Sequence, residues 1–453
     1  MGRDHDDDDD DRLAGLFERL RGGGGAAVPT SALGRLRRMA GTALRTARAA
    51  RKGGGPGEGL GAADPEAIER MVMSLGQLKG IAMKMGQILS YIDAEMPPET
   101  QRLLGLLQVY SQPTPFEAIA ATIREDVPAE ADAILASLDP EPAASASIGQ
   151  VHRARRPDGT QVAVKVRHPG IDEAIRADFR SASIGKVMGG LMAPGANIKE
   201  TIVEAQERFL EECDYGLEAT RQRRFGELLA GHARVDVPAV HDGWCGQRVL
   251  TTTWYDGVGF DRWLATEPSA AERAAVGRAL YDFYVGTLYR HGIFNADPHP
   301  GNLVFAPYGR LAVLDYGCVR AFDAATVRAL AALSEAVRDD DAPKIRDAMV
   351  GLGARDPGAA GERFDATRDL LRAFYGPVME RGSHVIAAGA STAIGQAYKT
   401  KRAIFRLRVP GKLLFLYRIR FGLYAVLARL GAEADWRAIE SELTDGVLSA
   451  RVP

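Results

Sequence analysis

Three polar residues in the middle of the chain have the types and spacing that phosphoryl transfer requires. Asp297 begins the turn-rich segment Asp-Pro-His-Pro-Gly-Asn, which ends at Asn302, and Asp315 follows the next short apolar run. An aspartate, an asparagine five residues later and a second aspartate after a hairpin are typical of metal-dependent phosphoryl transfer. Because Mg²⁺ prefers hard oxygen ligands, we expect Asn302 and Asp315 to bind the metal. Asp297 would orient or deprotonate an acceptor; alone, it could equally be a loop residue that caps a helix.

An upstream strand-like segment carries a lysine and follows a phosphate-loop pattern. Lys165 ends the apolar run Val-Ala-Val-Lys, which is typical of the lysine that contacts the α- and β-phosphates. The preceding segment has the layout of a glycine-rich loop with alanines at the first two glycine positions. Since alanine lacks the positive-φ freedom of glycine, we expect a stiffer loop. The expected nucleotide-binding residues here are Ala144, Ser145, Ala146, Ser147, Ile148, Gly149 and Val151.

Such a lysine needs a carboxylate partner on a helix. The candidates Glu212, Asp214 and Glu218 lie in a predicted helical zone at residues 199–230. Asp214 and Glu218 are four residues apart and share a helical face, whereas Glu212 and Asp214 do not. Because they do not all lie on one face, the three acids are expected to serve two different roles rather than one.

The hydrophobic pattern predicts an α+β protein whose small strand-rich part precedes a larger helical part. Strands are expected at residues 148–155, 161–166, 248–253 and 311–314, with a turn at Pro157-Asp158-Gly159. Helices are expected from residue 64 to about 89 and at 98–110, and then at 172–187, 199–230 and 324–338.

Composition limits the class of protein. A chain of 453 residues predicts two or three domains. Its 46% hydrophobic and 26% charged residues exclude disorder throughout. The net charge of −2 gives no reason to expect nucleic acid as a partner. Cys213, Cys245 and Cys318 follow no metal or disulfide spacing, which suits a reducing compartment.

Localisation is expected to be cytoplasmic. An acidic run occupies residues 6–11, where a secretory signal would need an apolar core, and the C-terminal apolar runs are shorter than the roughly 18 residues of a membrane span. The first sixty residues combine this acidic run, two glycine runs and the basic segment 31–52. That segment is either a solvated arm or a helix that contacts anionic lipid.

An acid-free basic segment near the C-terminus leaves a similar pair of alternatives open. Residues 381–432 contain no acid and ten cations: Arg381, Lys399, Lys401, Arg402, Arg406, Arg408, Lys412, Arg418, Arg420 and Arg429. One interpretation is that the apolar side packs on the helical lobe while the arginines reach water. The other is that the basic face contacts an anionic membrane at its periphery.

Five motifs in this order resemble the UbiB/AarF family of atypical kinase-like proteins, which is linked to ubiquinone and other isoprenoid-lipid metabolism. The resemblance covers about residues 71–432. The motifs are Lys84-Met85-Gly86-Gln87, the alanine-rich loop that runs into Ser147-Ile-Gly-Gln-Val-His152, Glu212-Cys-Asp214, Ala296-Asp-Pro-His-Pro-Gly-Asn302 and Asp315-Tyr-Gly317. Departures from the family pattern are Asn295 in place of a common His, Ser145 in the loop, and Thr252-Thr253 at the hinge.

The resemblance implies roles for these residues. Lys165 and Glu218 would form the phosphate-orienting pair, Asp297 would be the catalytic aspartate, and the hinge at Thr253 and Trp254 would contact the nucleotide. Lys84 and Gln87 would lie on a helical extension that covers the active site, where they face Glu212 and Asp214. His152 and His299 are expected to be structural turn residues. The implied ligands are ATP or ADP and Mg²⁺.

The implied fold is a two-lobe, protein-kinase-like α+β fold. Its expected parts are a disordered region at 1–63, the helical extension at 64–112, an N-lobe at 113–255, and a helical C-lobe with the C-terminal helices at 256–453. After Asp315-Tyr-Gly317 the sequence soon becomes helical, with no Ala-Pro-Glu and no long activation segment. A protein kinase needs that segment, so the acceptor is expected to be a small molecule, a lipid or water.

Two functions remain open at this point. The first is an ATP-binding, Mg²⁺-dependent atypical kinase or ATPase that supports isoprenoid-quinone or other lipid metabolism, with a prenylated small molecule as partner, rather than phosphorylating proteins. The alternative is a nucleotide-gated lipid-binding protein without physiological phosphate transfer. A small-molecule kinase of the aminoglycoside phosphotransferase type would share the Asp/Asn/Asp set. It would lack the Lys84–Gln87 extension and the alanine-rich loop.

Overall fold

The computed structural model describes residues 114–146, 148–179, 206–207, 209–354, 358, 361–387 and 411–450. The chain divides into two compact units. Unit 1 comprises Met1–Gly216 and His241–Thr251, and unit 2 comprises Leu217–Val240 and Thr252–Pro453. The predicted N-terminal region and extension, with Lys84 and Gln87, lie outside the described residues, as does Ser147.

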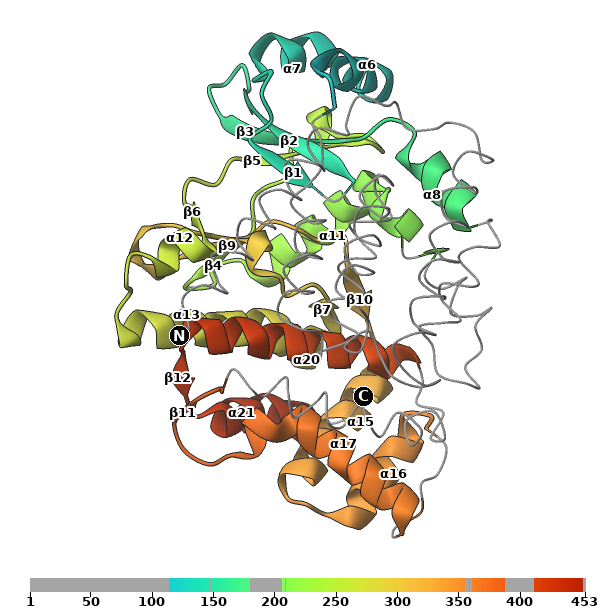
Figure 1. Ribbon diagram of the computed structural model, residues 1–453, viewed down its shortest axis with the longest axis vertical. Coiled ribbons are helices and arrows are strands. Elements are labelled where there is room, and N and C mark those ends of the chain that lie inside the picture. The colour runs from blue at the N-terminus through green and yellow to red at the C-terminus, as the bar shows by residue number, and fades with distance from the viewer. Residues whose placement is uncertain are drawn as a thin grey trace, which may run out of the picture. The chain divides into compact units, whose positions relative to one another are not determined.

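The described part of unit 1 contains one β-sheet and several short helices (Figure 1). Its four-stranded sheet has the order β1-β2-β3-β5, and the long hairpin β2–β3 pairs Gly149 with Arg167 at one end and Arg155 with Gln161 at the other. The strands are β1 (Ala144–Ala146), β2 (Gly149–Arg155), β3 (Gln161–Arg167) and β5 (Val249–Thr253), and the helices are α6 (Phe116–Asp126), α7 (Ala131–Ser137) and α8 (Ile171–Phe179).

Alternating burial explains why β3 forms here. Val162, Val164 and Val166 are fully buried, while the residues between them are half-buried. This period of two is the signature of a strand with one face on a core. The buried face packs with apolar residues of α6 and α7 in one cluster. At the hairpin turn Gly159 has φ +88°, a conformation that favours glycine. The predicted turn and both predicted strands are confirmed.

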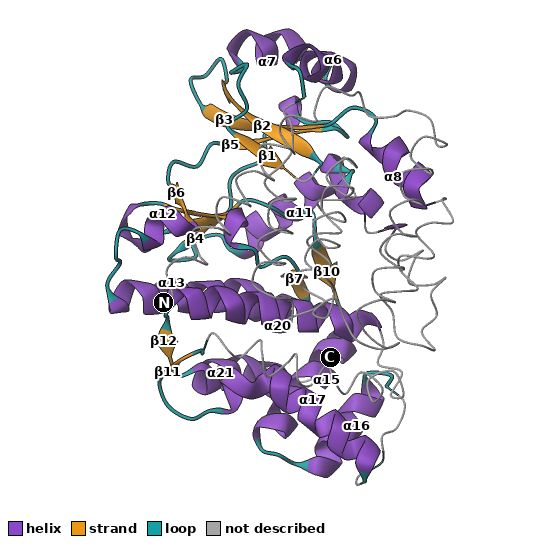
Figure 2. Ribbon diagram, in the orientation of Figure 1, coloured by secondary structure: helices purple, strands orange, loops and turns teal. Residues whose placement is uncertain are grey.

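Unit 2 is mainly helical, and its described part contains three small sheets (Figure 2). One sheet has the order β4-β9-β8-β6, a second pairs β7 with β10, and a third pairs β11 with β12. Strands are β4 (Val235–Asp236), β6 (Val258–Gly259), β7 (Ile293–Asn295), β8 (Leu303–Phe305), β9 (Leu311–Val313), β10 (Val319–Ala321), β11 (His384–Val385) and β12 (Glu433–Ala434). Helices are α11 (Tyr215–Leu228, which begins at the unit boundary), α12 (Phe260–Leu264), α13 (Ala270–Tyr281), α14 (Thr287–His291), α15 (Ala324–Arg338), α16 (Ala342–Gly351), α17 (Glu362–Met379), α20 (Gly411–Leu430) and α21 (Trp436–Ser449).

Side-chain caps define several helix starts in unit 2. Ser269 and Glu272 form a capping box at α13, and the Asp323 carboxylate accepts a hydrogen bond from Thr326 N–H at α15. Each cap satisfies a backbone donor that the helix itself cannot pair. The predicted helix at 324–338 is confirmed, and so is the mixed α+β fold class.

The predicted continuous helix at 199–230 is wrong at its centre. The chain leaves the helical conformation at Cys213 and Asp214, and α11 begins at Tyr215. Tertiary hydrogen bonds take the backbone groups that a continuous helix would use: Tyr215 N–H donates to the Gln247 carbonyl (3.1 Å), and Arg167 donates to the Cys213 carbonyl. Asp214 therefore precedes the helix that carries Glu218 and does not share its face.

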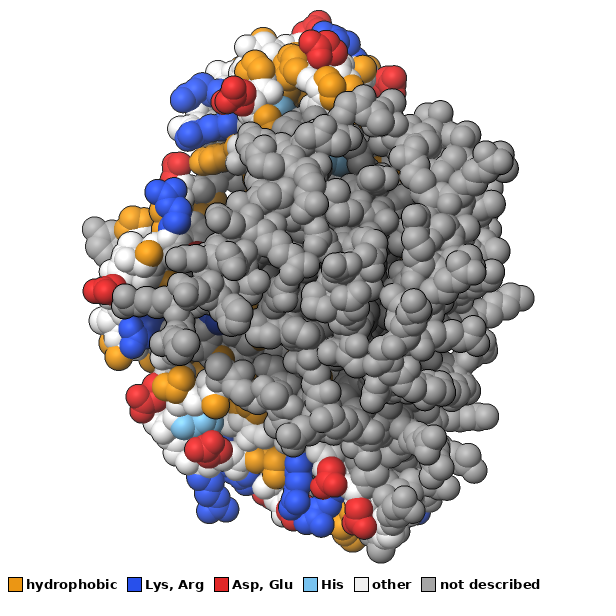
Figure 3. Space-filling view, viewed as in Figure 1, with side chains coloured by type: hydrophobic (Ala, Val, Ile, Leu, Met, Phe, Trp, Pro, Cys, Tyr) orange, Lys and Arg blue, Asp and Glu red, His pale blue; other side chains and the backbone are white. Residues whose placement is uncertain are grey.

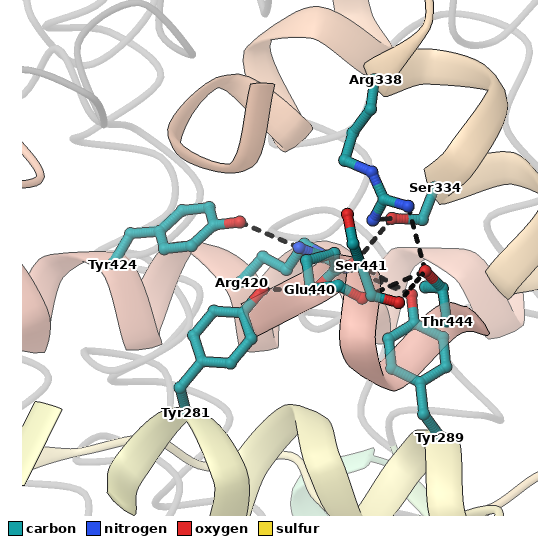
Figure 4. A network of polar contacts seen from close by, with 9 residues as sticks. All are labelled: Tyr281, Tyr289, Ser334, Arg338, Arg420, Tyr424, Glu440, Ser441 and Thr444. Carbon is teal, nitrogen blue, oxygen red and sulfur yellow. Dashed lines mark hydrogen bonds and ion pairs between the residues drawn. The ribbon is translucent and has the colours of Figure 1, made fainter. Parts of the chain in front are cut away.

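A buried ion pair corrects the expectation for one of the ten C-terminal cations. Arg420 of α20 is only 7% exposed and pairs with Glu440 of α21, which is fully buried (Figure 4). The Glu440 carboxylate also accepts hydrogen bonds from Tyr281, Tyr289 and Ser334. Arg420 therefore reaches neither water nor a lipid surface. The acid-free segment ends at residue 432, so the sequence pattern of that segment does not include the acidic partner, Glu440.

Of the other nine C-terminal cations, the structure describes the side chains of two, Arg381 and Arg429. Arg429 is exposed and pairs with Asp261, and Arg381 is exposed. Basic and acidic side chains of the described residues are interspersed on the face shown in Figure 3. The side chains of the other basic residues, from Lys399 to Arg418, lie outside the described part. Within the described part of the chain, no helix is both long and apolar enough to cross a bilayer.

Candidate active site

Unit 2 brings the three predicted phosphoryl-transfer residues together. The amide nitrogen of Asn302 donates to the Asp297 carboxylate (Nδ2 to Oδ2, 3.2 Å). Asn302 immediately precedes β8, whose first residue, Leu303, pairs with Val313 of β9. Leu314 N–H then donates to the Asn302 carbonyl (2.9 Å), so Asp315 follows directly beside Asn302. The β8–β9 hairpin is therefore what aligns the set.

The donor atoms of this set fit Mg²⁺. Because the Asn302 amide nitrogen is directed toward Asp297, its amide oxygen is the atom that can bind a metal. Asp315 supplies a carboxylate, whose Oδ1 accepts from Gly317 N–H (2.8 Å). Among the described residues no group of three or more His, Cys, Asp or Glu could hold a metal. A site built on one amide and one carboxylate suits Mg²⁺, which binds few protein ligands and keeps its waters.

Helix α11 supports the segment after Asp315. Glu218 is 2% exposed, and its Oε1 accepts from Tyr316 N–H (3.4 Å). One turn further along the helix, Arg221 donates to the Gly317 carbonyl (2.7 Å). Arg221 was not among the predicted site residues, although its spacing of three from Glu218 places it on the same helical face. Both contacts hold the Asp-Tyr-Gly backbone against α11.

Tyr316 anchors this segment in the core of unit 2. The side chain is fully buried, and its ring lies 5.2 Å from that of Phe225 and 6.4 Å from that of Phe283. Burial raises the pKa of the Tyr316 hydroxyl well above its usual value, so the residue stays neutral. Its role is to fix the backbone on either side of it.

In unit 1 the alanine-rich segment forms a hairpin. Ala144, Ser145 and Ala146 lie in β1 and pair with Val151, Gln150 and Gly149 of β2. None of these described residues has a positive φ, so alanine fits the backbone here without strain. Ile148 at the tip is buried. Nucleotide contact by this hairpin stays a prediction.

Gly149 is the position at which this hairpin requires glycine. A Cβ atom there would lie 2.4 Å from the Val166 carbonyl oxygen and 2.6 Å from the Tyr215 hydroxyl. Tyr215 is fully buried, and its ring centroid lies 4.9 Å from Lys165 Nζ. The ring thus supports the lysine head by a cation–π contact. Lys165 belongs to unit 1 and Glu218 to unit 2, and their pairing stays a prediction.

The Glu212-Cys213-Asp214 motif is held through its backbone. Arg167 at the end of β3 donates to the Cys213 carbonyl and pairs with Asp172 (3.4 Å). Burial raises the pKa of the Cys213 thiol to about 11, so this thiol is protonated at neutral pH and is no nucleophile. Glu212 and Asp214 are half-buried on either side. Their contact with Lys84 and Gln87 stays a prediction.

The hinge residues Thr253 and Trp254 make hydrogen bonds within unit 2, and their predicted contact with a nucleotide stays a prediction. Thr253 N–H donates to the Ala239 carbonyl (2.8 Å), and the Trp254 indole N–H donates to Asp256 (3.1 Å). The Tyr255 hydroxyl donates to Asp236 (2.7 Å), which holds this residue in place next to the hinge.

The two histidines make structural contacts, but only His299 lies in a turn as predicted, whereas His152 lies within strand β2. His152 is fully buried, and its Nδ1 faces the Asp139 carbonyl (2.7 Å), which fixes the proton on that nitrogen. His299 Nδ1 accepts from Gly301 N–H (3.0 Å) within the turn.

Comparison with known proteins places these residues in one family. The model of the ABC1 atypical kinase-like domain matches residues 106–349. The Arabidopsis thaliana protein named ACTIVITY OF BC1 COMPLEX KINASE 3, chloroplastic, is 35% identical over 238 residues, which are 52% of this chain and 34% of the plant protein. The rat protein named Atypical kinase COQ8B, mitochondrial, is 28% identical over 372 residues, which are 82% of this chain and 70% of the rat protein.

One solved structure has a similar fold. It is described as the complex structure of Rv3197-erythromycin from Mycobacterium tuberculosis, and it covers 85% of this chain and 97% of its own with a TM-score of 0.59 and 27% identity. The family match extends over more than half of the chain and includes every predicted catalytic and metal-binding residue. The chain therefore belongs to the ABC1 atypical kinase-like family, which confirms the UbiB/AarF resemblance.

Proposed function

We propose that this protein is an ATP-binding, Mg²⁺-dependent phosphotransferase or ATPase that supports isoprenoid-quinone or other lipid metabolism. The observation that carries the proposal is the joined set Asp297, Asn302 and Asp315, held by the Asn302 side-chain and backbone hydrogen bonds. Family membership supports the kinase-like class. A prenylated small molecule is the proposed acceptor or effector.

The connection after Asp315-Tyr-Gly317 argues against a peptide acceptor. Residues 319–321 form β10, which is paired with β7, and Phe322 N–H donates to the Gly292 carbonyl (2.7 Å). Asp323 then caps α15. The backbone between Gly317 and Ala324 therefore forms a strand and a helix cap and is hydrogen-bonded within unit 2. No long segment remains there to align a protein substrate, as protein kinases require.

Each proposed residue has a distinct task. Asp297 would hold the acceptor hydroxyl or a water and receive its proton. Lys165 would bind phosphate oxygens while the Tyr215 ring supports its ammonium group by the cation–π contact. Bound Mg²⁺ would neutralise the charge that develops on the phosphates. Asn302 and Asp315 would hold that ion, and Asn302 would also orient Asp297.

Two aspartate variants test the assignment. Asp315→Asn is expected to abolish Mg²⁺-dependent nucleotide binding, because the metal loses its carboxylate ligand. Asp297→Asn is expected to bind nucleotide like wild type but to lose turnover by about 10²–10⁴-fold, the range for a general base. Binding would be measured by calorimetry with and without Mg²⁺. ATP consumption would be measured with and without a prenylated phenol or anionic liposomes.

Asp347→Asn is the matched control, because Asp347 is 70% exposed and pairs only with its neighbour Arg346 among the described ion pairs. It should leave binding and turnover unchanged. If the Asp315 and Asp297 variants consume ATP like wild type, the proposal is wrong. Tight nucleotide binding by wild type with no turnover under any addition would support a nucleotide-gated binding protein instead.

A further inference from the structure

Asn295 is a fully buried polar residue between the two aspartate-bearing loops. It is the last residue of β7 and lies two positions before Asp297. In the β7–β10 ladder it pairs with Val319, and the next residue, Ala296, donates its N–H to the Cys318 carbonyl (2.7 Å). The strand that leads into Asp297 therefore runs alongside the segment that follows Asp315.

Both ends of the Asn295 side-chain amide are used. Its Nδ2 donates to the Asp315 carbonyl (2.7 Å), and its Oδ1 accepts from Asp297 N–H (2.9 Å). The two partners determine the amide orientation, because a carbonyl can only accept and an N–H can only donate. One side chain thus bridges the backbones of both aspartates and leaves their carboxylates to other contacts.

We propose that Asn295 is a positioning residue that sets the spacing between the catalytic carboxylate of Asp297 and the metal-binding carboxylate of Asp315. This inference rests on the proposed function. The position needs a donor at one end and an acceptor at the other, because the Asn295 side chain is itself fully buried. Aspartate keeps only the acceptor and leucine keeps neither, although both are close to asparagine in size. A buried partner left without its hydrogen bond carries a penalty that loosens its loop.

The two replacements predict different patterns of loosening. In Asn295→Asp, the residue still accepts from Asp297 N–H but now presents an oxygen to the Asp315 carbonyl. Only the segment 315–319 should then open more readily. In Asn295→Leu both bonds are lost, so the segment 296–302 should open as well. Amide hydrogen exchange on the ligand-free full chain would resolve the two segments, with the β2–β3 hairpin as internal reference.

Mg²⁺ titrations of nucleotide binding supply the second measurement. At a fixed ADP concentration, Asn295→Leu is expected to raise the Mg²⁺ concentration for half-maximal binding by about tenfold or more, because one lost hydrogen bond corresponds to up to about tenfold and this variant loses two. Thr287→Val is the control. Thr287 is also fully buried, and its hydroxyl donates to the Phe283 carbonyl within the helical core (2.7 Å) rather than to the backbone of either aspartate loop. This variant should lower stability without changing the Mg²⁺ requirement.

The outcomes separate this inference from the function on which it rests. If wild type shows no Mg²⁺-dependent nucleotide binding, the proposed function fails and the inference fails with it. If wild type binds and Asn295→Leu keeps both its Mg²⁺ requirement and its exchange pattern, only the inference fails. An equal Mg²⁺ shift in Thr287→Val would also overturn it, since the effect would then be general destabilisation. Should the leucine variant not fold, the segment-specific exchange of Asn295→Asp decides the question alone.

Discussion

At the residue scale, the packing around a few positions allows only one type of side chain. Gly149 is one, because a β3 carbonyl and the Tyr215 hydroxyl occupy the space that any Cβ would need. The alanines of β1 are the opposite case, since ordinary strand geometry accepts them. In the alanine-rich motif, packing therefore requires glycine at one position, Gly149. At the two positions where alanine replaces glycine, the backbone accepts alanine without strain.

We predict that Gly149→Ala lowers the free energy of unfolding by about 1–3 kcal/mol, the usual range for overpacking. The added methyl group meets backbone atoms of β3, which cannot move without disturbing the β2–β3 ladder. Urea unfolding would measure the change. Gly243→Ala is the control, because a Cβ at Gly243 meets no atom within 4 Å. A Gly149→Ala variant as stable as wild type would contradict the packing argument.

At the element scale, the helices of unit 2 are joined by a buried polar network (Figure 4). Glu440 on α21 pairs with Arg420 on α20 and accepts from Tyr281 at the end of α13 and Ser334 on α15. Arg338 of α15 extends the network to Thr444 (3.0 Å). The described partners satisfy the carboxylate on several sides, which is the condition under which a buried charge is tolerated.

We predict that Glu440→Gln destabilises the protein by about 3–5 kcal/mol, because it leaves the buried Arg420 charge without its counter-charge. Thermal or urea unfolding would measure the loss. Glu442→Gln, on the same helix, is the matched control: Glu442 is 75% exposed and its pair with Arg278 faces solvent. That change should have an effect below about 1 kcal/mol. Equal effects of the two substitutions would show that the buried network contributes no special stability.

At the scale of the whole molecule, several carboxylates have lowered pKa values. Burial raises the pKa of Glu440, but the Arg420 charge and the hydrogen bonds from Ser334 and Tyr281 outweigh it and leave the pKa below its usual value. The same balance holds for Asp282, whose burial is outweighed by His232 and Arg290, and for Asp236, whose burial is outweighed by Arg310 and Tyr255. These groups give the folded state a shared sensitivity to acid.

The sign of this effect gives a pH prediction. A carboxylate with a lowered folded-state pKa contributes stability above its unfolded pKa of about 4, and the contribution is lost as pH falls through the folded pKa. The free energy of unfolding of wild type should therefore decrease below about pH 4.5. The stability difference between wild type and Glu440→Gln should be constant from pH 5 to 8 and should shrink below that window. A difference that grows toward low pH would contradict the assignment.

Much of the site could be predicted from the sequence, because its signals are local. Asp297, Asn302 and Asp315 are recognisable from spacing, since a turn and a two-stranded hairpin convert that spacing directly into proximity. The alternation of residues 161–166 likewise predicts β3 and the position of Lys165, because a strand turns every second side chain to the same face.

Only the tertiary structure decided the features whose partners are distant in sequence. The break at Asp214 depends on Gln247 and Arg167, the burial of Arg420 depends on Glu440, and the bridging by Asn295 depends on the return of the chain at Asp315. A helical pattern or an acid-free segment reports only on neighbours along the chain. Whether a backbone group continues a helix, or a cation reaches the surface, depends on hydrogen bonds and charges that folding brings from elsewhere.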